Sequence, residues 1–137
     1  MKKILLTGGA GFISHHLIYY LIKNTNWNIV SLDRLDYSGN LNRLHDLLQE
    51  RTPAERKRVR TIFHDLKAEI NPMLEADIGK VDIIAHLAAG SHVDRSIERP
   101  MEFVMDNVVG TANLLDYGRR QDNLERFLYF STDEVFG

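Results

Sequence analysis

The 137-residue sequence has no cysteine, only three prolines and a single tryptophan. Without cysteine the chain has neither a disulfide framework nor a thiolate metal site, which fits a cytoplasmic location. Its formal net charge of −2 at pH 7 creates no basic field that would attract nucleic acid or an anionic membrane. No apolar run reaches the roughly 18 residues that a transmembrane helix needs. We therefore expect a protein that binds neither nucleic acid nor membrane.

The amino-terminal stretch MKKILLTGG combines two lysines with a short apolar run, as signal peptides do. Gly8 and Gly9 end this run too early for a signal peptide, so residues 3–7 are interpreted as a first buried strand. Short apolar runs of the same kind predict four further strands, at residues 28–32, 59–63, 81–85 and 126–130.

Helical spacing of apolar residues predicts helices between these strands, at residues 12–23, 40–50 and 100–120. In the first helix, Ile13, Leu17 and Leu21 are expected to share the buried face. The third is expected to be one long amphipathic helix that starts at Pro100 and carries Phe103, Val104, Val108, Leu114 and Leu115. The basic stretch at residues 51–60 is interpreted as a solvated turn.

Strands that alternate with helices predict an α/β protein with a parallel sheet covered by helices on both faces. The sequence shows no internal repeat, low-complexity segment or linker. Residues 1–137 are therefore expected to form one domain, a Rossmann-type doubly wound sheet that stops after its fifth strand.

A glycine-rich stretch, TGGAGFIS, joins the first predicted strand to the first predicted helix. Gly8 and Gly11 match the first two positions of a Gly-x-x-Gly-x-x-Gly loop, in which backbone N–H groups approach a pyrophosphate at a helix N-terminus. Ser14 stands at the third position, where a small residue lets helix and strand pack closely. A glycine-rich turn is weak evidence alone, and its strand–turn–helix context strengthens it.

The second predicted strand ends beside Asp33, whose carboxylate is placed to accept hydrogen bonds from ribose hydroxyls and to repel a 2′-phosphate. This favours NAD over NADP. Arg34 follows directly and offers the alternative of holding a 2′-phosphate. A plain turn residue is the simpler interpretation of Asp33, but the loop upstream favours the cofactor.

Four stretches occur in order along the chain, TGGAGFI, LDRLDYSGN, HLAAGSHVDRSI and FSTDEVFG. Together they resemble the extended short-chain dehydrogenase/reductase family, and within it the nucleotide-sugar 4,6-dehydratases that act on dTDP-glucose-like substrates. The resemblance covers nearly the whole chain. It implies NAD as cofactor, a nucleotide-diphosphate sugar as substrate, a role in deoxysugar biosynthesis and a homodimer for the complete enzyme.

The resemblance also implies roles for individual residues. Cofactor contacts are expected at Gly8, Gly11, Phe12, Ile13, Asp33, Arg34, Leu35, Asp36, Ser38, Gly39, Asp65, Leu66, Leu87, Ala88, Ala89 and Ser91. Ser91 and Thr132 are expected near the sugar. Thr132, Asp133 and Glu134 are the expected catalytic residues, and no metal site is expected.

The implied reaction eliminates water from the sugar after its C4 has been oxidised, which requires one base and one acid. Adjacent carboxylates supply both if one is ionised and the other protonated. Neighbours on a strand face opposite sides, so Asp133 and Glu134 act together only if the strand has already ended. The simpler interpretation of residues 131–134 is a helix cap followed by acidic first-turn residues.

Four positions depart from the pattern of the family. Ser14 replaces a glycine, Gly90 replaces a usual glutamate, Asp106 stands where threonine is common near the cofactor, and Phe136 replaces a tyrosine. Gly90 removes a charge beside the substrate and bears most on which sugar nucleotide fits.

The oxidation half of the reaction requires a Tyr-x-x-x-Lys pair, and the sequence contains one, Tyr19 and Lys23, in the first predicted helix. That helix lies behind the phosphate loop, so a surface tyrosine and a solvated lysine are the better interpretation. We therefore expect the cofactor-binding part of a longer enzyme, inactive by itself. A nucleotide-sugar epimerase or decarboxylase, and a non-catalytic NAD-binding module, are the alternatives.

Overall fold

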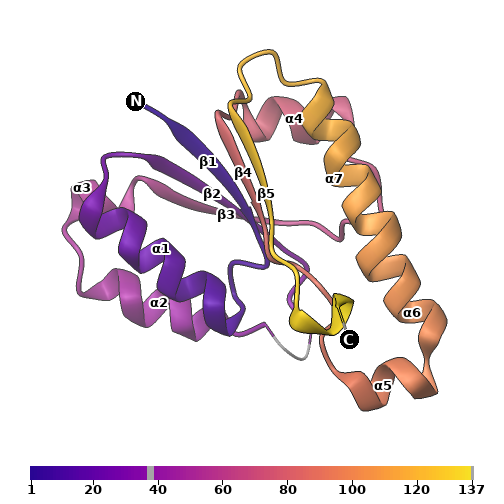
Figure 1. The fold of residues 1–137 in the computed structure, drawn as a ribbon. Coiled ribbons are helices and arrows are strands. Elements are labelled where there is room, and N and C mark those ends of the chain that lie inside the picture. Colours follow the sequence, from indigo (N-terminus) through magenta and orange to yellow (C-terminus); the bar gives the residue numbers. More distant parts are fainter. Residues whose placement is uncertain (37–38, 137) are drawn as a thin grey trace.

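The computed structural model describes residues 1–36 and 39–136. Five parallel strands form one sheet in the order β3-β2-β1-β4-β5. In Figure 1, α1, α2 and α3 lie on one side of this sheet, and α4, α6 and α7 lie on the other. The strand order steps outward in both directions from β1, which is the doubly wound Rossmann arrangement. The predicted fold class is confirmed.

The strands lie where the apolar runs predicted them, with small shifts at their ends. They are β1 (Lys3–Thr7), β2 (Asn28–Asp33), β3 (Val59–Phe63), β4 (Ile83–His86) and β5 (Arg126–Tyr129). Because parallel strands all end at the same edge, Thr7, Asp33 and His86 lie at one edge of the sheet. The polar loops that follow them are brought together there.

The helices are more numerous than the sequence predicted. They are α1 (Phe12–Asn24), α2 (Leu41–Gln49), α3 (Pro53–Arg56), α4 (Pro72–Ile78), α5 (Val93–Glu98), α6 (Pro100–Val104), the π-helical η1 (Met105–Val109), α7 (Gly110–Arg119) and the 3₁₀ helix η2 (Asp133–Val135). The short α4 and α5 were not predicted. None of the helices in the described parts of the chain is long and apolar enough to cross a bilayer.

Each face of the sheet carries its own apolar core. In β1, Ile4 and Leu6 pack with α1 and α2, whereas Leu5 packs on the opposite face with Leu114 and Tyr117 of α7. This alternation follows from the period of two along a strand. Each fully buried aliphatic side chain contributes about 1.5–3 kcal/mol, so the two cores hold the strand ends, and the loops above them, in place.

The buried face of α1 differs from the prediction. Ser14, Ile18, Leu21 and Ile22 are buried, whereas Ile13 is 65% exposed. The apolar spacing alone does not distinguish a buried face that contains Ile13 from one that contains Ser14, because neighbouring residues are only about 100° apart around a helix. The phosphate loop determines where α1 starts and thereby turns Ile13 outward, toward the open edge of the sheet.

The predicted turn at residues 51–60 contains the helix α3. Thr52 caps it, because its hydroxyl accepts a hydrogen bond from the Glu55 N–H at 3.2 Å and Glu55 accepts one from the Thr52 N–H at 2.9 Å. This reciprocal capping box, with Pro53 at the first helical position, makes a helix of four residues in an otherwise basic and polar stretch.

The helix predicted over residues 100–120 is a continuous run of α6, η1 and α7. Its apolar residues do not form one buried stripe: Leu114 is buried, but Val104, Val108 and Leu115 are between 43% and 61% exposed. The π-helical turn of η1 widens the helix in the middle and changes which residues share a face. Asp106 and Asn107 both lie in this turn.

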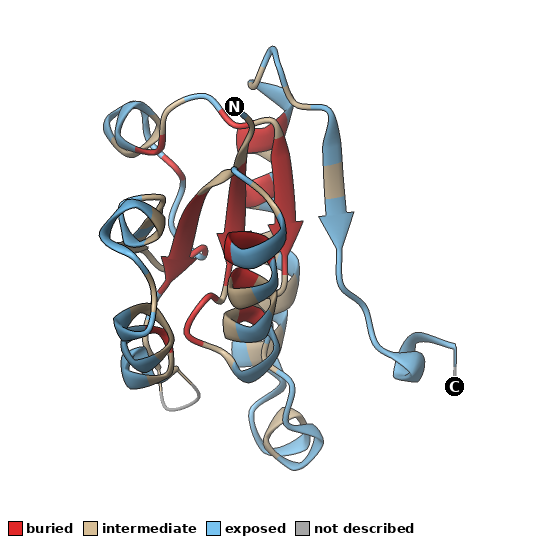
Figure 2. Ribbon diagram, turned by 90° about the vertical axis from the view of Figure 1, so that its left-hand side faces the viewer, coloured by how far each residue is buried: buried red, intermediate tan, exposed pale blue. Residues whose placement is uncertain are grey.

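Strand β5 lies at one edge of the sheet, as expected, and is the least buried strand. Figure 2 shows it mostly exposed beside the buried β1 and β4. The last described residues continue from it as an exposed segment that ends in η2.

Candidate functional site

A cleft of about 600 Å³ opens at the carboxyl edge of the sheet, where the chain leaves β1 and β4 for helices on opposite faces. Ligands of doubly wound folds bind at this switch point. The cleft is lined by Gly8, Gly11, Phe12, Ile13, Ser14, Leu32, Asp33, Arg34, Asp36, Gly39, Arg43, His64, Asp65, Leu66, Leu87, Ala88, Ala89, Ser91, His92, Asp106, Phe130, Ser131 and Thr132. The structure therefore brings together nearly all of the residues expected to contact the cofactor.

Among the described residues, one expected cofactor contact, Leu35, is not among those that line the cleft. Leu35 has a positive φ of 54° and belongs to the turn that follows β2. Arg34 and Asp36 on either side of it line the cleft, and the cofactor contact expected at Leu35 stays a prediction. Ser38 lies outside the described residues.

The phosphate loop has the geometry that its glycines predicted. Gly8 has a φ of 72°, and its N–H donates to the Leu32 carbonyl at 2.8 Å. A side chain at Gly8 would place its Cβ only 3.1 Å from the Cα of Ala88, so the loops after β1 and β4 touch here. Gly11 then leads into α1, whose first N–H groups have no carbonyl within the helix and face an incoming anion.

The serine at the third position of the loop is accommodated inside the fold. Ser14 is 3% exposed. The tightest approach between loop and strand occurs instead at Gly9, where a Cβ would lie 1.7 Å from the Ser31 Oγ. The close packing usually assigned to a third glycine is therefore supplied by Gly9, which the loop pattern did not single out.

Asp33 joins the end of β2 to the phosphate loop. One carboxylate oxygen accepts the Ala10 N–H at 2.9 Å, and the other accepts the Leu35 N–H at 2.7 Å. The side chain is 9% exposed and lines the cleft. A carboxylate offers about four lone-pair positions, so two remain for ribose hydroxyls. The turn interpretation and the cofactor interpretation of Asp33 are thus compatible.

Arg34 is held by two carboxylates from different parts of the chain. Its Nη1 and Nη2 donate to Asp106 at 2.5 and 2.8 Å, and its Nε and Nη2 donate to Asp36 at 3.1 and 2.7 Å. These hydrogen bonds, the one to Asp106 foremost, raise the pKa of Arg34 above its ordinary value. The hydrogen bond from Arg34 lowers the pKa of Asp106, which lies on η1.

Asp65 and Leu66 follow β3 and line the cleft beside this arginine. Leu66 is buried, and its carbonyl accepts a hydrogen bond from the Asn113 amide at 2.7 Å. A Cβ at Gly110 would lie 3.3 Å from the Leu66 Cβ, so the loop after β3 packs closely on α7. This places an apolar wall next to the acidic group.

The loop after β4 is tied to β1 through Thr7. Its hydroxyl oxygen accepts the N–H groups of Leu87 and Ala88 at 3.1 and 3.0 Å, and it lies 2.7 Å from the Nδ1 of His86. Since this oxygen already accepts two hydrogen bonds, its own proton donates to His86. The loop at residues 87–91 is thereby held where the sheet reverses its order.

The hydrogen-bond partners of His86 also define which of its ring nitrogens carries the proton. Its Nδ1 accepts from Thr7, so its Nε2 carries the proton and donates to the Thr111 hydroxyl at 2.9 Å, which donates in turn to the Asn107 carbonyl at 2.6 Å. Burial lowers the pKa of His86 to about 4, so the ring is neutral. His86 is therefore a buried histidine with both ring nitrogens hydrogen-bonded.

Gly90, which stands where the family usually has glutamate, packs closely against Asn107 and Phe103. Its N–H donates to the Asn107 side chain at 2.8 Å, and its carbonyl accepts from the same amide at 3.1 Å. A Cβ at Gly90 would lie 2.9 Å from the Phe103 ring. Phe103 therefore occupies the space that a larger residue at position 90 would need.

The residues after β5 contribute to the cleft only in part. Phe130, Ser131 and Thr132 line it, whereas Asp133 and Glu134 do not. Strand β5 ends at Tyr129, so Asp133 and Glu134 lie beyond the strand, which is the condition for the two carboxylates to act together. Asp133 and Glu134 begin η2, but Thr132 makes no side-chain cap there, and its hydroxyl lies 3.1 Å from a Glu134 carboxylate oxygen instead.

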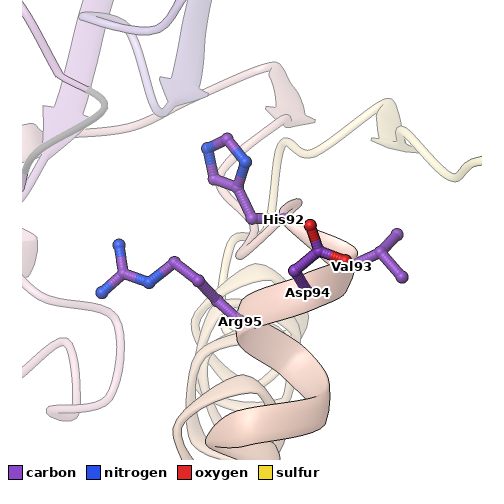
Figure 3. A pocket seen from close by; sticks show the side chains of 4 residues that line it. All are labelled: His92, Val93, Asp94 and Arg95. Atoms are coloured by element: carbon purple, nitrogen blue, oxygen red, sulfur yellow. The ribbon is translucent and has the colours of Figure 1, made fainter.

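A second hollow, of about 410 Å³, lies at the start of α5 and is lined by His92, Val93, Asp94 and Arg95 (Figure 3). In Figure 3, Arg95 and Val93 extend to opposite sides of the helix. His92 lines both this hollow and the main cleft. The hollow is formed by four consecutive residues and shares only His92 with the cleft.

Tyr19 and Lys23 are not residues of the cleft. The Lys23 ammonium lies 5.6 Å from the centre of the Tyr19 ring, and Arg51 stacks on the same ring at 5.1 Å. Within residues 1–36 and 39–136, no three histidine, aspartate or glutamate side chains gather as metal ligands would.

Several cleft residues were not predicted as contacts, among them Arg43, His64 and His92. Arg43 donates to the Ala10 carbonyl at 3.2 Å, which joins α2 to the phosphate loop. Asp106 was noted as a departure from the family pattern but not as a partner of Arg34. Sequence separation hides this pair, since only the folded sheet brings the two residues together.

The strand order, the glycine turn at the switch point and the acidic residue after β2 define a Rossmann-type domain of the short-chain dehydrogenase/reductase class. The family described as GDP-mannose 4,6 dehydratase matches residues 5–137, and the chain belongs to this family. The resemblance to nucleotide-sugar 4,6-dehydratases is thereby confirmed.

Individual proteins show the same relationship. The chain is 41% identical to dTDP-glucose 4,6-dehydratase of Salmonella typhimurium, over 98% of its own length and 38% of that protein. DesIV of Streptomyces venezuelae, a dTDP-glucose 4,6-dehydratase solved with NAD bound, is 35% identical, with a TM-score of 0.83 over 98% of this chain and 41% of that one. The chain thus spans well under half the length of these relatives.

A second enzyme class is also similar in structure. The UDP-Glc/GlcNAc 4-epimerase of Campylobacter jejuni has a TM-score of 0.85 and 29% identity, over 100% of this chain and 39% of that one. The fold is therefore shared by dehydratases and epimerases, and only particular residues distinguish the two.

Proposed function

We propose that this chain is the cofactor-binding part of a NAD-dependent nucleotide-sugar 4,6-dehydratase that acts on a dTDP-glucose-like substrate. The observation that carries the proposal is the joint placement, in one cleft, of the Gly8 turn, the Asp33 carboxylate and Thr132. The similarity to dTDP-glucose 4,6-dehydratases over 98% of the chain supports the same assignment.

The cleft has the chemistry that a dinucleotide requires. The N–H groups at the start of α1 suit a pyrophosphate, and Gly8 supplies the positive φ that the tight turn before this helix requires. Asp33 is placed to accept hydrogen bonds from the adenosine ribose, and Leu66 provides an apolar surface for the base. The loop at residues 87–91, held by Thr7 and Asn107, would contact the other end of a bound cofactor.

When bound, NAD supplies a reversible hydride acceptor for the sugar. Residues of this chain would carry out the elimination step. After C4 has become a ketone, one carboxylate of the Asp133–Glu134 pair removes the C5 proton, while the other, in its acid form, protonates the departing 6-hydroxyl. A C5–C6 double bond forms, water leaves, and Thr132 positions the sugar through its 4-oxygen.

We also propose that the 137-residue chain alone binds NAD without turnover. Oxidation at C4 needs a base that takes the hydroxyl proton, and the Tyr-x-x-x-Lys pair of the family serves this purpose. The pair present here, Tyr19 and Lys23, contacts Arg51 on the α1 side of the sheet instead of lining the cleft.

An epimerase is the second candidate, because the epimerase of Campylobacter jejuni superposes on this chain with a TM-score of 0.85. Asp133 favours the dehydratase, since the epimerases and decarboxylases of this class usually carry a small or hydroxyl residue there. A protein that only senses NAD is the third candidate, and it too would use the cleft.

Two measurements test the proposal. Calorimetric titration of the chain with NAD⁺ should show binding at one site, and a folded chain without such binding would overturn the cofactor assignment. In a protein that carries this domain at the length of its curated relatives, Asp133→Asn should keep hydride transfer from the sugar and lose water elimination. Unchanged elimination in that variant would contradict the dehydratase assignment.

A further inference from the structure

We propose that Asp106 selects NAD over NADP by holding the guanidinium of Arg34 away from the ribose 2′ position. This inference rests on the proposed binding of NAD and deepens it. Arg34 follows Asp33 directly, so it has the sequence position at which an arginine accommodates a 2′-phosphate in dinucleotide-binding folds. What the arginine does therefore depends on the groups that already occupy its donors.

Most of the hydrogen-bonding capacity of Arg34 is used within the protein. A guanidinium has five N–H donors. Asp106 accepts from both terminal nitrogens, at 2.5 and 2.8 Å, and Asp36 accepts from Nε and Nη2, at 3.1 and 2.7 Å. The contact with Asp106 is the paired, two-point geometry that binds guanidinium most strongly, and it is the geometry that a phosphate would need.

Asp36 and Asp106 differ in how they can restrain the Arg34 side chain. Asp36 lies two residues from Arg34 on the same loop and moves with it. Asp106 comes from η1, on the other side of the β3 loop, and its side chain is only 14% exposed. It therefore anchors the arginine to a separate, rigid element. Releasing Arg34 would leave a largely buried carboxylate without its main partner, which is unfavourable.

The surrounding charges act in the same direction. Asp65 lies 3.8 Å from the Arg34 Nη1, and Lys67 lies 3.4 Å from Asp65 and 3.6 Å from Asp106. With Asp33 and Asp36, this end of the cleft carries more carboxylates than cations. A 2′-phosphate would add negative charge here, and Arg34 could pair with it only by turning away from Asp106.

The π-helical turn of η1 explains how one element serves both ends of the cleft. Asp106 reaches the loop after β2, and the next residue, Asn107, holds Gly90 in the loop after β4. Single π-helical turns occur often at functional sites.

The test compares affinities for NAD⁺ and NADP⁺ by calorimetric titration of the folded chain. In the unaltered chain, NAD⁺ should bind at least about a hundredfold more tightly than NADP⁺. In Asp106→Asn, the released arginine should strengthen NADP⁺ binding by about tenfold to a hundredfold, the range expected for a new charge-assisted contact. The ratio of the two affinities is the readout. Asp106→Thr should give the same change.

A double variant separates the effect of the Arg34–Asp106 contact from the effect of simply removing a charge. Arg34→Met together with Asp106→Asn should lose the gain in NADP⁺ affinity, because no guanidinium remains to bind the phosphate. If the double variant keeps the gain in NADP⁺ affinity, the loss of one negative charge accounts for that gain. The proposed role of the Arg34–Asp106 contact is then wrong. Asp116→Asn, which removes a carboxylate that pairs with Arg119 on α7, is the matched control and should leave the ratio unchanged.

The outcomes distinguish the two proposals. If the folded chain binds neither cofactor, the proposed function fails and this inference fails with it. If NAD⁺ binds but Asp106→Asn leaves the affinity for NADP⁺ unchanged, only the role of Asp106 is overturned. Circular dichroism of each variant checks that the fold is retained.

Discussion

The loop after β2 and the segment after β5 both follow parallel strands, yet the chain treats their carboxylates differently. Asp33 is 9% exposed and accepts two backbone N–H groups, one of them from the phosphate loop. Glu134 is exposed and lies near the Thr132 hydroxyl, two residues away. The first carboxylate has a long-range contact, with the Ala10 N–H, besides its local one with Leu35, whereas the second, within the described residues, has only a local one.

This difference indicates which functions the chain supports by itself. The adenosine end of the cleft is assembled from β1, β2 and η1, whose contacts do not depend on a ligand. Asp133 and Glu134, the carboxylates proposed for the elimination, begin a short exposed helix beside an edge strand. We therefore expect cofactor affinity to reside in the first region and to be insensitive to changes in the second.

The largest effect is expected at Asp33. Asp33→Ala removes the acceptor for the Ala10 and Leu35 N–H groups and the proposed ribose contact, so NAD⁺ affinity should fall at least about a hundredfold. Calorimetric titration measures this. Asp46→Ala, at an exposed position of α2, is the matched control. An unchanged affinity in Asp33→Ala would remove the distinction between the two regions.

The next effect concerns pH and the neutral His86. Burial lowers its pKa to about 4 from 6.5, so the unfolded chain binds the proton more readily. The free energy of unfolding should fall as pH decreases from about 6.5 to about 4, by at most about 3 kcal/mol. Urea unfolding across this range tests the sign.

Carboxylates titrate in the lower part of the same range, so a variant has to separate their contribution. His86→Asn keeps an acceptor and a donor but has no titrating ring. The variant should therefore lose the part of the slope that lies between pH 5 and 6.5. Equal slopes in both proteins would show that His86 does not resist protonation.

A smaller effect is expected at Thr111, which links His86 to Asn107. Thr111→Val leaves the His86 Nε2–H without its acceptor and should lower the free energy of unfolding by about 1–2 kcal/mol. Thr111→Ser keeps the hydroxyl and should recover most of this loss. Chemical denaturation of the two variants side by side is the measurement, and equal stability of the two would contradict the hydrogen-bond chain.

The smallest effect is expected in the exposed segment. Glu134→Gln should change the free energy of unfolding by less than about 0.5 kcal/mol, as is usual at exposed positions. Its NAD⁺ affinity should stay within about twofold of the unaltered chain. A larger loss of either quantity would show that the segment contributes to the cofactor site and would weaken the comparison.

The strands, the phosphate loop and the position of Asp33 were predictable because each depends on local patterns. Buried parallel strands read as continuous apolar runs, and glycine is required where φ is positive, as at Gly8. The helix α4 also had a local signal, with Asn71 as its cap and Pro72 at its first position, which apolar spacing alone overlooked. Its seven residues are too few for a clear amphipathic period.

Other features required the folded chain. The buried face of α1 depends on the sheet register and the loop, so the apolar spacing assigned Ile13 to the wrong side. The contact of Gly90 with Phe103, and that of Arg34 with Asp106, join residues far apart in sequence whose separate positions show no pattern. Such pairs, among them the one proposed here to set the cofactor preference, become visible only in the folded chain, so the fold is easier to predict than the specificity.

Hydrogen exchange of the chain with and without NAD⁺ tests the central comparison most directly. The account predicts slower exchange at residues 8–14 and 33–36 when NAD⁺ is bound, and little change at residues 133–136. Slower exchange at residues 133–136 without protection of the phosphate loop would contradict it.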